Sequence, residues 1–375
     1  MALWHSSIPI ENTNRTGVRI MRFIPSSCLK PGMVTAKDLY GYNNELMLSE
    51  GQVLSRIEII RINLLKFQGI FIEDELSADI EVENVIDLKL KNNTVKALKE
   101  IFKQTERGEV EYEDISYLKN KVDDIINDLI ENKNVAINMI DLKIFDDYTY
   151  YHSVNVFILS IIIGISKGMQ KQELYKLGMG ALLHDIGKVF VPKEVLDKPG
   201  KLTDDEFEII KTHSKKGSDY LRDKWDISNE SNLAVLTHHE KVDGTGYPYQ
   251  LKGEKIPEYG KIISVADVYD ALTSDRPYRK SMLPSEAVEY IMGGSGTLFE
   301  PSIVEVFVAR VMPYPIGTCV KLSNGLIGIV VENYTENCMR PKIKIISKSK
   351  NDDTYCDLYH ERELLNVTII EIADL

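Results

Sequence analysis

Histidine is unevenly distributed along this 375-residue sequence, and its distribution suggests metal chemistry. Five of the seven histidines lie between residues 152 and 239, and one of them is followed directly by an aspartate. A single histidine on an apolar helix is usually a hydrogen-bonded core residue, but several buried imidazoles without a shared partner would each cost desolvation free energy. Imidazole and carboxylate donors together suit iron, manganese or zinc, whereas an all-oxygen magnesium or calcium site would not need so many nitrogens. The residues are His152, His184, Asp185, His213, His238 and His239.

The stretch "ALLHDIGKVFVP", residues 181–192, contains the second of these histidines. Neighbouring side chains on a helix point about 100° apart, so His184 and Asp185 can reach one point only if it lies between them. Lys188 comes one helical turn after His184, which predicts that the two project from the same face. Most lysines are solvated surface residues, and that interpretation stands beside a catalytic one.

The elements that must position these residues are predicted to be helices. Residues 146–312 have helical patterning, with Pro and Gly mostly in loops such as "DGTGYP". The apolar run at residues 156–165, "VFILSIIIGI", is about half as long as a bilayer requires, so it predicts a buried helix and no membrane span.

The flanking regions have other patterns. Residues 21–84 mix strand-like segments with one helix-like stretch, which predicts a small α+β module, and residues 1–20 are expected to be a loose extension. Residues 85–145 show the spacing of amphipathic helices and are expected to connect this module to the next domain. Residues 313–375 change to a period of two around an Asn-Gly turn, which predicts a small β-rich domain. The expected fold is mainly α, a helical bundle between two small modules.

Composition limits the classes of partner. A net charge of −12 argues against a long nucleic acid, which needs a basic face, but is compatible with a small phosphate ester in a locally basic pocket. The four cysteines lie far apart without a C-x-x-C motif, which favours reduced thiols and a cytoplasmic location. The first residues include Glu11 and no sustained apolar run, so no signal peptide is expected.

The ordered set of histidines and aspartates resembles the HD superfamily of metal-dependent phosphohydrolases. It comprises His152, the His-Asp pair at 184–185, His213, the His pair at 238–239 and Asp267 in "SVADVYDALTSDRPYR". The segment "HHEKVDGTGYP", residues 238–248, is similar to the HD-GYP group of cyclic di-GMP phosphodiesterases. The resemblance covers about residues 140 to 310, and the ordered set is far more specific than a single His-Asp dipeptide.

The resemblance implies a centre with two divalent transition-metal ions, iron or manganese. His152, His184, Asp185 and Asp267 would hold one ion, and His213, His238 and His239 the other. Asp185 would bridge the two, with a hydroxide between the ions attacking phosphorus in line with the leaving oxygen. Asp185 and Lys188 are the expected catalytic residues, with Lys188 directed at the nucleophile or the phosphate.

The resemblance also implies residues that contact the substrate. They are Lys188, Asp243, Gly244, Gly246, Tyr247, Pro248, Asp270, Arg276 and Arg279. Alone, D-G-x-G-Y-P is only a turn, but beside paired histidines it is expected to shape the pocket, with Tyr247 packing there or meeting a guanine. Asp270, one turn after Asp267, is expected to face the substrate or to orient a ligand. Arg276 and Arg279 match positions that contact nucleotide phosphates in the family, although exposed arginines are usually solvated.

The implied activity is hydrolysis of cyclic di-GMP to the linear dinucleotide pGpG, and whether the reaction continues to GMP stays open. Two alternatives stay open: another cyclic dinucleotide such as cyclic GMP-AMP as substrate, and a signalling adaptor that binds cyclic dinucleotides without turnover. Neither flanking module indicates a regulatory ligand, and a homodimer or signalling protein partners are compatible with both.

One position departs from part of the family. Some members carry a Glu one helical turn before the first metal-binding histidine, where it supports a third metal, and here that position is Tyr148. A phenol with a pKa of about 10 is a poor ligand because it stays protonated at neutral pH. Asp146 and Asp147 fall further round a helix and are better interpreted as capping or solvated residues. The sequence therefore predicts a two-metal site.

Overall fold

The computed structural model describes residues 18–41, 45–65, 67, 69–74, 81–83, 86–132, 148–274, 281–346 and 354–373. Several predicted features lie outside the described residues: most of the extension 1–20, Asp146, Asp147, Arg276 and Arg279. Tyr148 lies in a described helix, but its side chain is not among those described.

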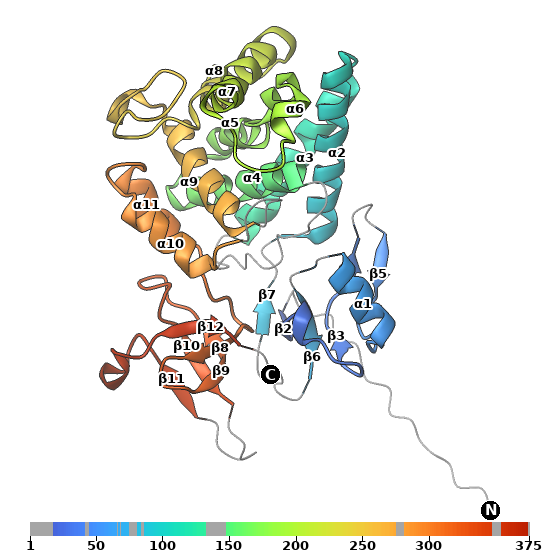
Figure 1. The fold of residues 1–375 in the computed structure, drawn as a ribbon, viewed down its shortest axis with the longest axis vertical. Coiled ribbons are helices and arrows are strands. Elements are labelled where there is room, and N and C mark those ends of the chain that lie inside the picture. Colours follow the sequence, from blue (N-terminus) through green and yellow to red (C-terminus); the bar gives the residue numbers. More distant parts are fainter. Residues whose placement is uncertain are drawn as a thin grey trace, which may run out of the picture.

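A helical bundle makes up the larger part of the molecule (Figure 1). Its central helix is α4 (Tyr148–Ser166), which is apolar on nearly all sides because neighbouring helices cover it, so that Val154, Phe157 and Ile161 are fully buried. The bundle contains α5 (Lys171–Leu182), α6 (Lys193–Leu196), α7 (Asp204–Lys224), α8 (Asn229–Thr237), α9 (Glu258–Thr273), α10 (Pro284–Gly293) and α11 (Pro301–Val308). Helices α5 and α9 pack directly on α4.

Helices α2 (Leu88–Arg107) and α3 (Tyr112–Glu131) are the amphipathic helices expected within residues 85–145. Their apolar faces bury Leu98 and Val122 in the same core as α4. Helix α2 packs against α4, and α3 packs against both α4 and α5. These helices are therefore part of the bundle as well as a link to the module before it.

One helix is long and apolar enough to cross a membrane by length and composition, over Thr149–Ser166 within α4. Of that window, 78% is buried inside the structure. This burial is that of a core helix, as the apolar run at residues 156–165 predicts.

The N-terminal module combines short strands with one helix. A three-stranded antiparallel sheet has the order β2-β6-β3, β4 pairs with β5 in antiparallel fashion, and β1 pairs with β7. Helix α1 (Arg56–Leu64) starts at a capping box made by Ser55 and Glu58. The strands are β1 (Val18–Ile20), β2 (Arg22–Pro25), β3 (Val34–Thr35), β4 (Leu39–Tyr40), β5 (Leu46–Leu48), β6 (Gly69–Glu73) and β7 (Glu81–Glu83). The predicted α+β character of this region is confirmed.

The C-terminal region is an antiparallel sheet of five strands in the order β11-β10-β9-β8-β12. The strands are β8 (Cys319–Leu322), β9 (Ile327–Glu332), β10 (Lys342–Ile345), β11 (Tyr355–Asp357) and β12 (Ile369–Ile372). The predicted Asn-Gly turn joins β8 to β9, and Gly325 takes a positive φ of 86° there, which suits glycine. The predicted β-rich character is confirmed.

The two small modules pack against each other beside the bundle (Figure 1). The Phe23 N–H donates to the carbonyl oxygen of Gly317 at 3.0 Å, and Phe23 forms an isolated parallel bridge with Thr318. We call the apolar cluster between them the joint. Its buried members are Met21, Phe23, Ala36, Phe71, Cys319 and Ile329.

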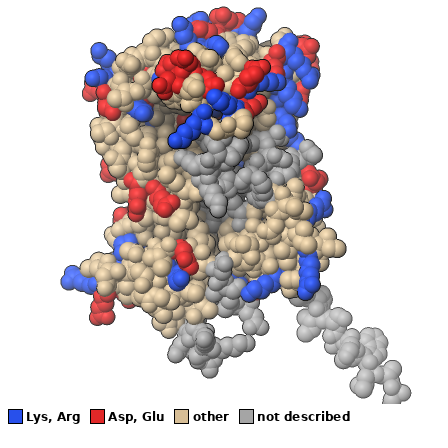
Figure 2. Space-filling view, viewed as in Figure 1, with Lys and Arg blue, Asp and Glu red and all other residues tan. Residues whose placement is uncertain are grey.

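Charge is mixed on the surface. Figure 2 shows Lys and Arg lying among Asp and Glu on the face in view, and no broad basic area dominates it. Basic and acidic side chains are thus interspersed on this face of a chain whose net charge is −12.

Candidate metal centre and active site

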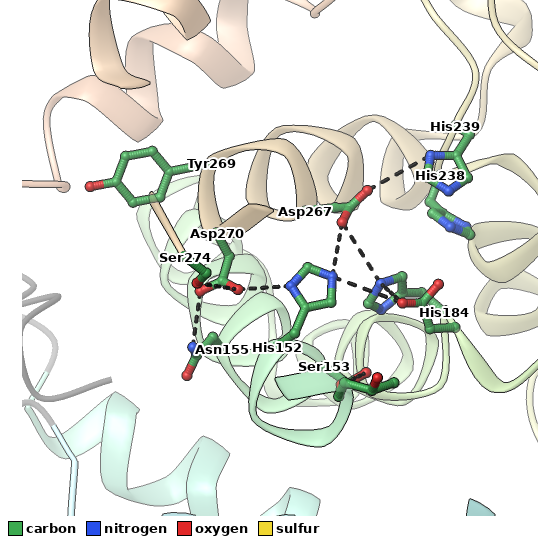
Figure 3. Close-up of polar contacts among 12 residues, drawn as sticks. His152, Ser153, Asn155, His184, His238, His239, Asp267, Tyr269, Asp270 and Ser274 are labelled. Atoms are coloured by element: carbon green, nitrogen blue, oxygen red, sulfur yellow. Dashed lines mark hydrogen bonds and ion pairs between the residues drawn. The ribbon is translucent and has the colours of Figure 1, made fainter. Parts of the chain in front are cut away.

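The seven side chains predicted to bind metal converge inside the bundle. Figure 3 labels His152, His184, His238, His239 and Asp267 among them. Five helices contribute the seven side chains: His152 on α4, His184 and Asp185 after α5, His213 on α7, His238 and His239 after α8, and Asp267 on α9. All are buried except His239, whose side chain is 24% exposed. A substrate or solvent molecule can therefore approach from the His239 side.

The His-Asp pair does not lie on a continuous helix. Helix α5 ends at Leu182, and the pair occupies a turn before the 3-10 helix η4 (Ile186–Phe190). The prediction that Lys188 and His184 project from one helical face is therefore wrong. The chain turns here so that η4 can lie against α7, and Gly187 packs so closely that a Cβ there would overlap the backbone oxygen of His213.

The donor atoms form two groups, in each of which they lie within 4.8 Å of one another. One group is His152, His184 and Asp185, and the other is His213, His238 and His239. Asp185 lies between the groups. Its Oδ2 is 3.4 Å from Nε2 of His184, and its Oδ1 is 3.5 Å from Nε2 of His213. One carboxylate thus faces both groups, as a bridging ligand must.

Asp267 closes the opposite side of the centre. Its Oδ1 lies 3.0 Å from Nε2 of His152, and its Oδ2 lies 3.7 Å from Nδ1 of His239 (Figure 3). The resemblance implies a role only at the first ion, but in the structure this carboxylate also reaches toward the second group.

Three histidines are held in the same way by the backbone. In each, Nδ1 lies within hydrogen-bond distance of the carbonyl oxygen three residues earlier. When Nδ1–H donates this hydrogen bond, Nε2 carries no proton, and its lone pair can bind a metal ion. The pairs are His184 with Ala181 at 2.8 Å, His213 with Ile210 at 2.8 Å and His238 with Val235 at 2.7 Å. The same local contact with the backbone therefore aims three lone pairs at the centre, although only His213 lies within a helix.

The donor set fits transition-metal ions. The Nε2 atom of His184 is buried and has no hydrogen-bond partner among the described residues, a cost that an ion would remove. Burial lowers the pKa of His213 and His238, and it lowers the pKa of His239 to about 3. These imidazoles are therefore neutral at neutral pH, which is the form that binds metal.

The pKa of His152 is raised, in contrast to those of the three histidines above. Burial lowers its pKa, but hydrogen bonds and ion pairs with Asp267 and Asp270 outweigh burial and raise the pKa of His152 to about 9. Without metal, the His152 imidazole is therefore protonated on both nitrogens and positively charged at neutral pH. An ion that binds Nε2 must displace the proton there.

Asp270 lies behind His152 and is fully buried. Its Oδ2 is 2.7 Å from Nδ1 of His152, and its Oδ1 accepts a hydrogen bond from Nδ2 of Asn155 at 2.9 Å. The Ser274 hydroxyl donates to Oδ2 at 3.4 Å (Figure 3). Of the two roles expected for Asp270, these contacts fit orientation of a ligand rather than contact with substrate.

Lys188 lies at the edge of the centre. Its Nζ is 2.6 Å from Oδ2 of Asp185, and its side chain is 28% exposed. Burial raises the pKa of Asp185, but the Lys188 ammonium and the imidazoles of His184 and His213 hold that pKa well below its ordinary value. Lys188 thus contacts a carboxylate that is expected to bind metal, and its side chain is only partly exposed.

The loop at residues 243–248 places one aromatic ring at the centre. Tyr247 packs on His239 with ring centroids 4.6 Å apart and 33° between the planes. Gly244 has a φ of 81°, which suits glycine, and Gly246 is buried. The carboxylate of Asp243 is exposed and accepts from the backbone N–H and the hydroxyl of Thr245, so its contacts shape the turn.

Glu240 was not among the predicted site residues. It is 2% exposed, and its two oxygens accept hydrogen bonds from the N–H groups of Tyr249 at 2.7 Å and Leu251 at 3.0 Å. Glu240 directly follows His239, so these hydrogen bonds fix the segment after Pro248 next to the histidine pair. An acidic residue directly after a pair of histidines was the available signal in the sequence.

Comparison with known proteins agrees with this geometry. Residues 134–303 match the HD domain family. A cyclic di-GMP phosphodiesterase of Pseudomonas aeruginosa is 37% identical over 238 residues, which are 64% of this chain and 57% of that protein. A cyclic di-GMP phosphodiesterase of Vibrio cholerae is 49% identical over 142 residues, covering 36% of this chain and 28% of that protein. A 3′3′-cGAMP-specific phosphodiesterase of V. cholerae is 38% identical over 142 residues, covering 38% and 27% respectively.

The helical bundle and its histidine–aspartate centre lie in the region that matches the HD domain family. The segment "HHEKVDGTGYP" at residues 238–248 is similar to the loop of the HD-GYP group, and the relatives named above are cyclic dinucleotide phosphodiesterases. The chain spans less than two thirds of the length of each of these relatives.

Proposed function

We propose that this chain is a metal-dependent phosphodiesterase that hydrolyses cyclic di-GMP to pGpG, and further to GMP. The observation that carries the proposal is the carboxylate of Asp185, whose two oxygens face separate groups of histidines. Hydrolysis of a phosphodiester requires that negative charge on the attacking and leaving oxygens is neutralised. A pair of metal ions can neutralise it. The names of the relatives support cyclic di-GMP as the substrate.

The residues that would hold two divalent transition-metal ions, iron or manganese, are the seven that the sequence predicts. When bound, the ions supply Lewis acidity and lower the pKa of the attacking water. Asp185 and Asp267 each direct one oxygen at the first group of histidines and the other oxygen at the second group, so each carboxylate would help to hold the ions. The neutral imidazoles of His213, His238 and His239 supply nitrogen donors.

The substrate would be bound around the exposed side of this centre. Lys188 holds a positive charge beside Asp185, where a phosphate oxygen can meet it. Tyr247 offers a ring face next to His239 for a guanine. We also propose that Arg276 and Arg279 contact the phosphates, as the family resemblance implies; Arg276→Ala or Arg279→Ala should weaken substrate binding and leave metal content unchanged.

A turnover assay with added manganese or iron tests the proposal. We expect pGpG from cyclic di-GMP, detected by chromatography, and no product from an Asp185→Asn variant. Faster turnover of cyclic GMP-AMP would support the alternative substrate, which the similarity to a cGAMP-specific enzyme favours. Tight binding of either dinucleotide without product in the metal-loaded protein would overturn hydrolysis and support a signalling adaptor.

Elemental analysis tests the number of ions. We propose two per chain, because Tyr148 stands where a third ion would need a carboxylate. Three ions in a fully loaded sample would contradict this number. We further propose a cytoplasmic location, and that residues 146–312 act as the catalytic unit with the flanking modules as sites for partners or a second copy.

A further inference from the structure

Lys211 lies beside the loop that places Tyr247 at the metal centre. It is on α7, two residues before His213, a predicted metal ligand. Its Nζ is 5.7 Å from the centroid of the Tyr247 ring, and that ring packs on His239 with centroids 4.6 Å apart. The side chain of His239 is the partly exposed one among the predicted ligands. Lys211 therefore lies on the side from which a substrate can approach.

Aromatic rings hold the ammonium group of Lys211 in place. Its Nζ lies 4.9 Å from the centroid of Phe207, one helical turn earlier on α7, as well as near Tyr247. Attraction between a cation and ring faces stabilises this position and leaves the N–H groups able to donate to an anion. The Lys211 side chain is 27% exposed, so a ligand can reach it.

One carboxylate competes for this charge. The Lys211 ammonium donates to Oε1 of Glu208 at 2.5 Å, and the side chain of Glu208 is 68% exposed. An ion pair so open to water contributes only about 0.2–1 kcal/mol. A phosphate oxygen can therefore replace the carboxylate at Lys211 at little cost. Lys188 differs, because its partner is the buried carboxylate of Asp185.

A cyclic dinucleotide carries two phosphodiester groups, and one of them is cleaved first. The metal centre and Lys188 would meet the scissile group, which leaves the negative charge of the other group to be balanced elsewhere. We propose that Lys211 binds this second phosphate and so favours a cyclic dinucleotide over a substrate with a single phosphodiester. The inference rests on the proposed function and adds a residue to its substrate site.

Steady-state kinetics of the manganese-loaded full chain with two substrates tests the assignment. Cyclic di-GMP has two phosphodiesters, whereas bis(p-nitrophenyl) phosphate has one and would be cleaved at the same metal centre. In Lys211→Met, we expect KM for cyclic di-GMP to rise by about tenfold, because a hydrogen bond between charged groups is lost. The kcat for cyclic di-GMP and both constants for bis(p-nitrophenyl) phosphate should stay unchanged. Lys224→Met, exposed on the same helix, is the matched control and should leave all these constants unchanged.

Two further variants separate the charge of Lys211 from its packing. Glu208→Gln removes the competing carboxylate, so KM for cyclic di-GMP should fall by about two- to fivefold. Lys211→Arg keeps the positive charge and should restore most of the affinity that Lys211→Met loses. A KM in Lys211→Arg as high as in Lys211→Met would show that packing, and not charge, is what the substrate needs, and would overturn the proposal.

The remaining outcomes are distinct from a failure of the proposed function. An unchanged KM for cyclic di-GMP in Lys211→Met, or an equal loss with both substrates, would overturn the assignment of Lys211 alone. No turnover of cyclic di-GMP by the unaltered chain would contradict the proposed function. Calorimetric titration of the manganese-loaded chain with cyclic di-GMP would then decide about Lys211: weaker binding by Lys211→Met supports its role, and equal binding or none overturns it.

Discussion

At the residue scale, the centre depends on a carboxylate that faces two groups of histidines. Asp185→Asn keeps the size of the side chain and removes the charge that two cations would share, so we expect loss of at least one ion and a fall in turnover of about a hundredfold or more. Elemental analysis and the turnover assay measure the two effects separately, and circular dichroism checks that the fold is kept. Asp223→Asn on the exposed face of α7 is the control. Full metal content with normal turnover would refute the ligand assignment.

His152 makes metal uptake depend on pH. Its pKa of about 9 in the metal-free protein lies above the ordinary value of 6.5, so a proton competes with the ion at all pH values below 9. The affinity for the first ion should therefore rise with pH by up to about tenfold per unit until pH reaches the pKa. Manganese titration of the metal-free protein at several pH values tests this, and a flat affinity would contradict it.

Glu240 positions the loop that carries Tyr247. Glu240→Gln replaces one acceptor oxygen with an amide that cannot accept from a backbone N–H, which leaves one buried donor of the loop unpaired. We expect KM to rise by about tenfold, with kcat and metal content nearly unchanged. Glu254→Gln on the exposed turn that follows is the control. A fall in kcat alone would show that Glu240 acts elsewhere.

At the element scale, the contact between η4 and α7 determines where the His-Asp pair and His213 meet. Gly187→Ala forces a Cβ into the backbone oxygen of His213, so the two elements must separate. We expect destabilisation of about 1–3 kcal/mol and a lower metal content. Denaturant unfolding and elemental analysis measure these effects. Gly293→Ala in α10, where a Cβ meets nothing, should have neither effect, and the same result for Gly187→Ala would contradict the close packing.

The contact between η4 and α7 also explains why the spacing of apolar residues predicted the helices but not the end of α5 at Leu182. The apolar spacing in α2 and α3 and the unbroken apolar run in α4 are local signals, and each predicts its helix. The break after Leu182 arises from Gly187 meeting α7, which is a tertiary constraint without a local pattern. The three residues of β11 are likewise too few to show a period.

At the scale of the whole molecule, the joint links the two flanking modules. Ile329 is 1% exposed within it, so Ile329→Ala should destabilise the protein by about 2–5 kcal/mol. Denaturant unfolding followed by fluorescence measures this. Ile370→Ala, on an exposed position of the same sheet, is the control. Equal stability of the two variants would mean that the joint contributes little.

The sequence could predict each module but not their contact, because nothing local relates residues so distant along the chain. Arg22 lies 3.4 Å from the Cys319 sulfur across 297 positions. In the site, the family resemblance covered the metal-binding residues, whereas the positions of Asp270 and Glu240 depend on how α4, α9 and the loop pack.

The joint also means that its two sides are synthesised at different times. A ribosome delivers Met21 and Phe71 first, and their partners Cys319 and Ile329 emerge close to 300 residues after Arg22. At about 5–20 residues per second, that interval is roughly 15 to 60 s. Throughout it, the nascent N-terminal module exposes an apolar face that only the last part of the chain can cover. Chaperones that hold nascent chains should therefore bind this protein at its first module and be released only as the final sheet forms.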